Sequence, residues 1–496
     1  MVDFSLEDRK LLSAHVSNMD KNIYLIKNLP PEVVAVLFAY VSRSPATFRE
    51  NLLKLIKEKD IDLETLVTQV ADHNQAKEKA RKFHEKWVVG YGHSSVAEHA
   101  VASIALEDVS ILASKTIEDN RLASFTEKST RYQIFDHNRY YKPQLSPELE
   151  KLFEETCNYL FDLYSENINK AIEFMKKKYP RGDQPERVYE AITKARACDI
   201  MRYILPIGTL TNIGMTGNSR VYEHAIRKLI SHPLQEMRNI GIGMKTEIQK
   251  LIPTLVRHAD HNSYIHDTKK DFHTFTPTVL DKEVTHEKPV SIVGYDQDAE
   301  NRLVAGMLYK YTEQPYSQIM QKVKSMTNQE KDEIFEKFLK SMSKFDWPLR
   351  ELEHVNYTFD ILIDYGAFRD IQRHRICTQT NQLATVTHGY DIPEEIKEMG
   401  LGEKFSEAME RARETFLTIQ KSFPYEAQYV IPLAYRRRTL FTWNLRELHH
   451  FIKLRTSRQG HTSYRIVARA CYDELAKLHP LIAKYIRVQD IDGPAR

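Results

Sequence analysis

The feature that most constrains the fold of this chain is an internal repeat. Four pairs of segments recur in the same order: 32–40 and 301–309, 98–99 and 353–354, 205–206 and 431–432, and 218–220 and 444–446. The last two pairs are also spaced alike, because the asparagine lies 12 positions after the proline in each half. A single shared dipeptide would mean little, but four anchors in one order indicate a tandem duplication.

The chain is too long for one ordinary hydrophobic core, since it has 496 residues. The segment with the weakest structural pattern, about 258–300, is rich in His, Thr, Pro and charged residues. We therefore predict a boundary near residue 280, with domains at 1–280 and 281–496.

Both halves have the pattern of an α+β fold. Apolar residues alternate over 355–363, and a helical pattern follows at 365–376, which predicts a strand that leads into a helix. The first half repeats this order at 101–106 and 109–117. This pattern defines a fold class but no function.

Composition argues against several classes of protein. A net charge of +3 predicts no nucleic-acid binding. No run reaches about 18 apolar residues and no signal peptide is present, so we expect a cytoplasmic protein without a membrane span. The four cysteines form no CxxC pair, which predicts reduced thiols without a disulfide or a zinc site.

The strongest local feature is Arg373-His374-Arg375. Near the end of a helix, three such residues can reach one ligand, and guanidinium groups match phosphate or carbonyl oxygens. The alternative is a solvated basic patch. Cys377 follows closely, but no partner motif supports a nucleophile there, so we expect a buried small residue.

A second candidate is the segment Ser129-Thr130-Arg131, with Glu127 before it. A hydroxyl and a guanidinium two residues apart in a turn can hold a phosphate. An ordinary Ser/Thr turn is the alternative.

Histidines invite a metal hypothesis, because His93 lies five residues before Glu98-His99. The spacing fits neither HExxH nor HxxEH, since Ser95 stands where a ligand would be needed. We therefore predict no metal.

The segment 444–455 predicts an amphipathic helix. Arg446, His450 and Arg455 are candidates for its polar rim, although such a helix is often only part of a core.

Together, these motifs resemble the flavin-dependent thymidylate synthase (ThyX) family. Its subunits carry Gly-His-x-Ser-x-x-Glu-His, a strand, a helix ending in Arg-His-Arg, and then Ser-x-Arg, Leu-Pro, Asn-x-Arg and Leu-Arg. The first half of this chain keeps 92–99, 129–131 and Arg202 before its Leu-Pro. The second half keeps 373–375, Asn444, Arg446 and Arg455.

Each half lacks what the other keeps. In the first half, Glu118-Asp119-Asn120 stands at the Arg-His-Arg position. At the Leu-Arg position stands Leu229, or Ile230 after a shift of one residue, so the arginine is missing. In the second half, Leu383 and Thr385 replace Ser-x-Arg, and Gln428 replaces the arginine before Leu-Pro. In the resembled family these two sets come from two subunits of one nucleotide site. The resemblance therefore implies a pseudo-dimer with one composite active site per chain, and a homodimer similar to the family's tetramer.

The resemblance also implies FAD-dependent reductive methylation of dUMP to dTMP, with methylenetetrahydrofolate as carbon donor and NADPH as reductant. Arg455 would be the catalytic residue, stabilising negative charge on the uracil. The dUMP site would consist of Glu127, Ser129, Thr130, Arg131, Arg202, Arg373 and Arg455. The FAD site would consist of Arg373, His374, Arg375, Asn444, Arg446, His450, His93 and Ser95.

Three departures from the family leave the substrate open. Thr130 replaces a glycine, Asp370 falls where a nucleotide-contacting glutamine is common, and 460–462 replaces an Ala-Gln pair. Another pyrimidine nucleotide, or hydroxymethyl transfer, is compatible with them. Two further alternatives are an inactive flavin- or nucleotide-binding relative and a nucleic-acid binder that uses 435–438, against which the balanced charge argues.

Overall fold

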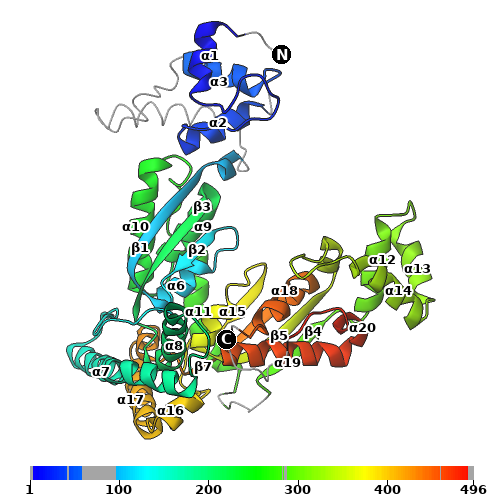
Figure 1. The fold of residues 1–496 in the computed structure, drawn as a ribbon. Coiled ribbons are helices and arrows are strands. Elements are labelled where there is room, and N and C mark those ends of the chain that lie inside the picture. Colours follow the sequence, from blue (N-terminus) through cyan, green and yellow to red (C-terminus); the bar gives the residue numbers. More distant parts are fainter. Residues whose placement is uncertain are drawn as a thin grey trace. The chain divides into compact units, whose positions relative to one another are not determined.

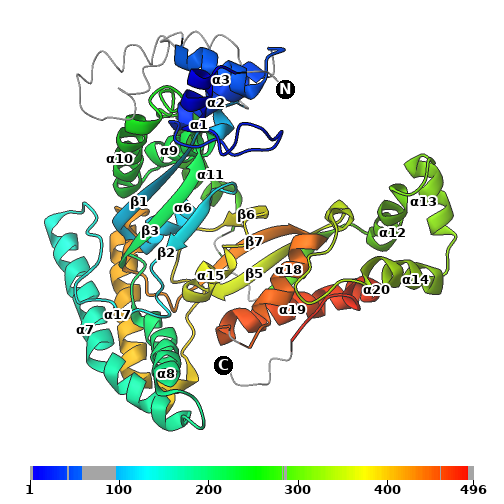
Figure 2. The same cartoon turned by 45° about the horizontal axis from the view of Figure 1, so that its top comes forward.

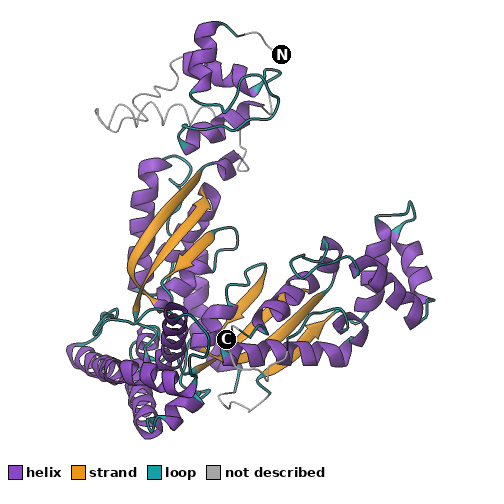
Figure 3. Cartoon of the chain, in the orientation of Figure 1, coloured by secondary structure: helices purple, strands orange, loops and turns teal. Residues whose placement is uncertain are grey.

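The computed structural model describes residues 4–41, 44–57, 96–281, 283, 288–458 and 460–489. The chain forms two compact units (Figure 1). The first consists of Met1–Val109, Leu122–Glu127 and Asn212–Asp281, and the second of Ser110–Arg121, Lys128–Thr211 and Lys282–Arg496. Both units contain helices and a sheet, which confirms the predicted α+β class (Figure 3). The boundary near 280 concerns the sequence repeat and stays a prediction.

The first unit contains a three-stranded sheet with the order β1-β3-β2. Its strands are β1 (Val101–Ser110), β2 (Ser124–Glu127) and β3 (Leu210–Asn218). Two helices that pack against each other follow β3, namely α9 (Ser219–Ile230) and α10 (Gln235–Leu251). Glycine is required at 241 because a Cβ there would lie 2.9 Å from Leu229 and Ile230 of α9.

The other helices of the first unit are α1 (Leu6–Ser13), α2 (Pro31–Val41), α3 (Phe48–Lys57) and α11 (Ser263–Val279), with the short η2 (Val96–His99). Apolar residues of α1, α2 and α3, such as Leu12, Val36 and Leu52, form a small core of their own.

The second unit contains a four-stranded antiparallel sheet with the order β4-β5-β7-β6. Its strands are β4 (Val290–Tyr295), β5 (Asn356–Asp364), β6 (Cys377–Asn381) and β7 (Arg436–Asn444). Trp443 anchors the core beneath this sheet, because its ring stacks 4.6 Å from both Phe441 and Phe451.

Helices follow or flank these strands: α15 (Tyr365–Ile371), α18 (Leu445–Arg455), α19 (Thr462–Leu478), α20 (Pro480–Ala483), α12 (Ala299–Tyr309), α13 (Tyr316–Lys324) and α14 (Asn328–Leu339). The predicted helix 365–376 is too long. It ends at Ile371, so residues 373–375 lie in the connection to β6, where side chains can point to one side together.

The remaining elements of the second unit are α6 (Ile111–Glu118), α7 (Pro147–Lys178), α8 (Glu186–Met201), α16 (Glu394–Glu398), α17 (Gly402–Gln420), η3 (Arg202–Ile204), η4 (Arg350–His354) and η5 (Glu426–Val430). The long helices α7 and α17 lie side by side (Figure 2), and Thr156 of α7 hydrogen-bonds Thr415 of α17 at 2.8 Å.

The repeat is visible in the backbone hydrogen bonds of the second unit. Ile207 N–H donates to the Ile431 carbonyl at 2.8 Å, and Leu433 N–H donates to the Leu205 carbonyl at 2.9 Å. Gly208 and Ala434 repeat this exchange with Tyr429 and Tyr203. Since equivalent residues exchange equivalent bonds, these segments are related as in a two-fold contact.

Local structure is also repeated at the helix starts. The Asn218 side chain caps α9 by accepting from Val221 N–H at 3.0 Å, and Asn444 caps α18 in the same way at 2.9 Å. Likewise Ser110 caps α6 and Asp364 caps α15. The tandem duplication is therefore confirmed.

One correspondence differs from the sequence analysis. The cap Ser110 lies 12 positions after Glu98, but the cap Asp364 lies only 11 positions after Glu353. Asp108, with φ 54°, accommodates the additional residue in β1. Residues 119–121 thus correspond to Arg373-His374-Arg375, so the assignment of 118–120 was wrong by one residue and the first copy keeps the last arginine as Arg121.

Candidate active site

Four arginines and two aspartates gather in the second unit. We call Arg131, Arg202, Arg373, Arg455, Asp199 and Asp370 the arginine cluster. Arg131 follows β2 in a turn, and Asp199 and Arg202 lie at the junction of α8 and η3. Asp370 belongs to α15 and Arg455 ends α18. The first copy thus supplies three of these side chains and the second copy the other three.

Arg131 is held by two carboxylate oxygens. Its Nε donates to Asp199 Oδ1 at 2.8 Å and its Nη2 donates to Oδ2 at 2.9 Å, which is the bidentate geometry that guanidinium groups form with carboxylates. Its Nη1 donates to the Tyr464 hydroxyl of α19 at 3.4 Å. Although burial lowers the pKa of Arg131, the charge of Asp199 raises it above its ordinary value. Asp199 therefore occupies the fork that a phosphate would use.

Arg202 is almost completely enclosed, with 2% of its side chain exposed. Its nearest charged partners are Asp199 at 3.5 Å and Asp370 at 3.6 Å. Two of its nitrogens, Nε and Nη2, have no hydrogen-bond partner among the residues that the structure describes. A buried guanidinium with such nitrogens can donate hydrogen bonds to a ligand.

Asp370 is the acidic centre of the cluster. Burial would raise the pKa of this carboxyl, but Arg202, Arg455, Arg131 and Arg373 together hold the pKa below its ordinary value. Arg455 also donates a hydrogen bond to the backbone carbonyl of Asp370. Asp370 is therefore an anion in the folded protein at neutral pH.

A chain of three side chains fixes Arg455. Its Nε donates to His374 Nε2 at 3.0 Å, and His374 Nδ1 lies 2.8 Å from Glu447 Oε1. Because Nε2 accepts, the proton of His374 is on Nδ1 and is donated to Glu447. Burial and Arg455 keep the pKa of His374 well below its ordinary value, so the ring is neutral. Burial raises the pKa of Glu447 to about 7.

The Arg-His-Arg segment lines a cavity of about 270 Å³ that includes Trp347, His450 and Arg455. The rings of Trp347 and His450 are stacked with centroids 3.9 Å apart and planes 23° apart. Arg373 is exposed, His374 is buried, and Arg375 donates to the Asn120 carbonyl at 3.1 Å. Flat rings beside guanidinium groups suit an aromatic ligand that carries negative charge.

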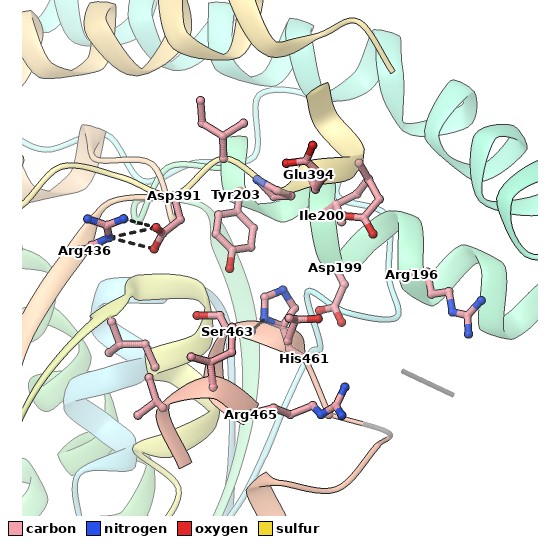
Figure 4. Close-up of a pocket in the computed structure, with 18 of the residues that line it drawn as sticks. Arg196, Asp199, Ile200, Tyr203, Asp391, Glu394, Arg436, His461, Ser463 and Arg465 are labelled. Atoms are coloured by element: carbon pink, nitrogen blue, oxygen red, sulfur yellow. Dashed lines mark hydrogen bonds and ion pairs between the residues drawn. The ribbon is translucent and has the colours of Figure 1, made fainter. Parts of the chain in front are cut away.

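Asp199 also lines a larger cavity, of about 760 Å³ (Figure 4). Tyr203 and His461 line it, with ring centroids 5.6 Å apart and planes 27° apart. Burial lowers the pKa of His461 to about 4, so this histidine is neutral. Asp391, which pairs with Arg436, and the side chains of Arg196 and Arg465 also line this cavity.

The predicted dUMP residues are in part brought together. Arg131, Arg202 and Arg455 join the arginine cluster, and Thr130 is buried where its hydroxyl accepts from Arg369 at 2.9 Å. Ser129 forms the turn, since its hydroxyl accepts from Arg131 N–H at 3.1 Å. Glu127 ends β2 in the first unit.

Two predicted FAD residues have structural contacts of their own. Asn444 caps α18, and Arg446 binds the Pro348 carbonyl at 2.7 Å and Glu353 at 3.0 Å. His93 and Ser95 lie outside the described residues. The assignments of all these residues to FAD stay predictions.

Four residues of the site were not predicted from the sequence, namely Asp199, Glu447, Tyr464 and Trp347. Asp199 has a signal in the sequence, because it lies three residues before Arg202, a spacing at which two side chains can meet on one face of a helix. Glu447 also follows a recognised motif, the Asn-x-Arg at 444–446. For Trp347 and Tyr464 we find no such signal.

Within the described part of the chain, no group of three or more His, Cys, Asp or Glu side chains is placed to hold a metal ion. No described helix is long and apolar enough to cross a membrane.

The fold and the site define a class: a duplicated α+β protein in which two arginine-rich motifs converge. The profile of the Thy1 family, described as thymidylate synthase complementing protein, matches residues 25–254 and 291–481. The chain therefore belongs to this family, and the resemblance to flavin-dependent thymidylate synthases is confirmed in both halves.

Individual relatives agree with this assignment. A UPF0159 protein of Chlamydia pneumoniae is 34% identical over 514 residues, 99% of this chain and 96% of the relative. A flavin-dependent thymidylate synthase of Sulfolobus acidocaldarius is 30% identical over 201 residues, 40% of this chain and 68% of the relative. A crystal structure of ThyX from Helicobacter pylori, complexed with FAD and dUMP, is 18% identical with a TM-score of 0.31 and covers 41% of this chain and 100% of its own.

Proposed function

We propose that this chain is an FAD-dependent enzyme that reductively methylates dUMP to dTMP, with methylenetetrahydrofolate and NADPH as co-substrates. We further propose one composite active site per chain. The observation that carries this proposal is the contact between the copies: Arg202 lies 3.6 Å from Asp370, and Arg131 donates to Tyr464 at 3.4 Å.

The nucleotide would be held by its phosphate. Arg202 supports this role, because its Nε and Nη2 have no hydrogen-bond partner among the described residues. Arg131 would contribute once its fork exchanges Asp199 for phosphate oxygens, and Ser129 and Thr130 would shape the turn that presents it. The resemblance adds Glu127 and Arg373 to the proposed dUMP residues.

Arg455 would act on the uracil. Its Nε is committed to His374, and one Nη2 proton to the Asp370 carbonyl, which fixes the plane of the guanidinium. A cation held in one orientation stabilises the negative charge that develops at the N3/O2 edge of the pyrimidine. Burial lowers the pKa of Arg455 and Asp370 opposes that shift, so the paired carboxylate helps to keep the group charged.

The smaller cavity would hold part of a flavin nucleotide. The stacked Trp347 and His450 offer a flat surface, and Arg373 and Arg375 offer charge for phosphate or carbonyl oxygens. His374, Asn444, Arg446, His93 and Ser95 belong to the same proposal. FAD would supply the hydride. The residues of this chain would bind it, orient it and exclude water.

The first experiment is an absorbance spectrum of the purified protein, followed by anaerobic NADPH and dUMP. We expect about one flavin per chain, bleaching by NADPH, and formation of dTMP with methylenetetrahydrofolate. Arg202→Gln and Arg455→Gln should each abolish dTMP formation, whereas Arg413→Gln, in an exposed pair with Glu410, should not. Two flavins per chain would contradict the composite site.

Mixing the two inactive variants tests whether the site lies within one chain. Each chain of the mixture still lacks one arginine of its own site, so we expect no recovery of activity. Recovery would show that the two halves of a site come from different chains. Gel filtration and light scattering test the proposed homodimer, and fractionation of cells tests the proposed cytoplasmic location.

A relative with altered specificity is the second candidate, and Asp370 favours it. A carboxylate stands where the family commonly has glutamine, among arginines proposed to bind phosphate. This candidate predicts flavin binding and NADPH oxidation without dTMP formation, and turnover with another pyrimidine nucleotide.

A further inference from the structure

The arginine cluster contains more negative charge than a phosphate site needs. Arg131, Arg202, Arg373 and Arg455 contribute four positive charges, and Asp199 and Asp370 contribute two negative charges. His374 and His461, the neighbouring histidines, are neutral because burial lowers the pKa of each. The formal charge of these six side chains is therefore +2, which is opposite in sign to that of a phosphomonoester.

Both aspartates are placed to act on a phosphate without binding it. Asp199 occupies the fork of Arg131 at 2.8 and 2.9 Å, and Asp370 lies 3.6 Å from the Nη1 of Arg202. The side chains of Arg202 and Asp370 are 2% and 8% exposed, so water screens their charges weakly. Each aspartate therefore weakens the attraction that its partner, Arg131 or Arg202, exerts on an anion.

We propose that Asp370 and Asp199 set how strongly the site responds to ligand charge: they lower the positive charge of the arginine cluster and so reduce the advantage that more highly charged nucleotides have over nucleoside monophosphates. This inference rests on the proposed nucleotide site but not on turnover. A cluster of four arginines without these aspartates would attract a diphosphate more strongly than a monophosphate, because Coulomb attraction grows with ligand charge.

The test is a titration of three ligands that differ in charge, namely deoxyuridine, dUMP and dUDP, followed by calorimetry. In wild-type protein the affinity should rise only weakly from deoxyuridine to dUMP and dUDP. Compared with wild type, Asp370→Gln should gain affinity by about threefold for each unit of negative charge on the ligand. Its affinity should therefore be unchanged for deoxyuridine, about tenfold higher for dUMP and about thirtyfold higher for dUDP. Glutamine fits this position in size, and thermal unfolding of the variant checks its fold.

Three further variants isolate the charge effect. Asp199→Asn should steepen the dependence on ligand charge in the same direction, whereas Asp370→Glu, which keeps the charge, should not. Asp360→Asn is the matched control, because Asp360 and Arg438 form a pair at 2.9 Å with 19% and 15% exposure, similar to the 14% and 17% of Asp199 and Arg131. This control should leave all three affinities unchanged.

Two outcomes overturn the inference and are distinguishable. If wild-type protein binds dUMP but the variants change the three affinities by one common factor or not at all, the charge-based role of the aspartates is refuted while the proposed function stands. If no variant and no wild-type sample binds any of the three ligands, the nucleotide site itself is refuted, and both proposals fail.

Discussion

Replacing Glu447 by glutamine should stabilise the protein, and more so as the pH rises. Burial raises the pKa of Glu447 from 4.5 to about 7, so the folded state binds its proton more tightly than the unfolded state does. The folded state therefore loses stability as the pH rises from the unfolded to the folded pKa. Glutamine still accepts the His374 Nδ1 proton but cannot ionise, so the variant avoids this loss.

The magnitude follows from the two pKa values. Between pH 5 and pH 8, the ionisation of Glu447 costs the wild-type protein about 2 kcal/mol of unfolding free energy that the variant keeps. Glu447 is only 8% exposed, so solvent screening reduces this figure little. Urea unfolding of both proteins at pH 5, 6, 7 and 8 measures the difference.

A difference in unfolding free energy that stays constant across this range would refute the reasoning. Glu353→Gln is the control, because a hydrogen bond from Arg350 lowers the pKa of Glu353 and both of its pKa values then lie below pH 5. The difference between wild type and this control should be flat from pH 5 to 8. A slope in the control would indicate that another group titrates.

Three other predictions concern single contacts. Arg131→Met should lower the unfolding free energy by about 2 kcal/mol in urea titrations, because it leaves the partly buried Asp199 without its bidentate partner; no loss would mean that this pair is dispensable. Trp443→Ala should cost about 4 kcal/mol in the same assay, since it opens a cavity between two stacked rings; a cost below about 1 kcal/mol would show that the core refills. The Cys377 thiol is buried, and burial raises its pKa to about 12. It should therefore resist a thiol reagent in the native protein and react once the protein is unfolded. Labelling of the native protein, measured by mass spectrometry, would contradict its burial.

The sequence predicted much of the architecture because a duplication leaves a signal at fixed spacing. The anchors Pro206 and Pro432 face each other in an antiparallel bridge, and the caps Asn218 and Asn444 begin equivalent helices. The one-residue error at 118–120 came from the residue added near Asp108 in the first strand. An insertion of this kind changes the local conformation without interrupting a motif.

The sequence alone determined the fold class, the family and the motifs: a duplicated α+β chain of the Thy1 family in which each copy keeps motifs that the other has lost. The tertiary structure decided which side chains of these motifs contact one another. Arg131 meets Asp199 across 68 residues and His374 meets Glu447 across 73. Neither pair has a periodic or fixed spacing, because such contacts depend on which helix ends the packed core brings together. The charge of the arginine cluster and the orientation of Arg455 follow from those contacts, since only packing sets the distance between groups that lie far apart in the chain.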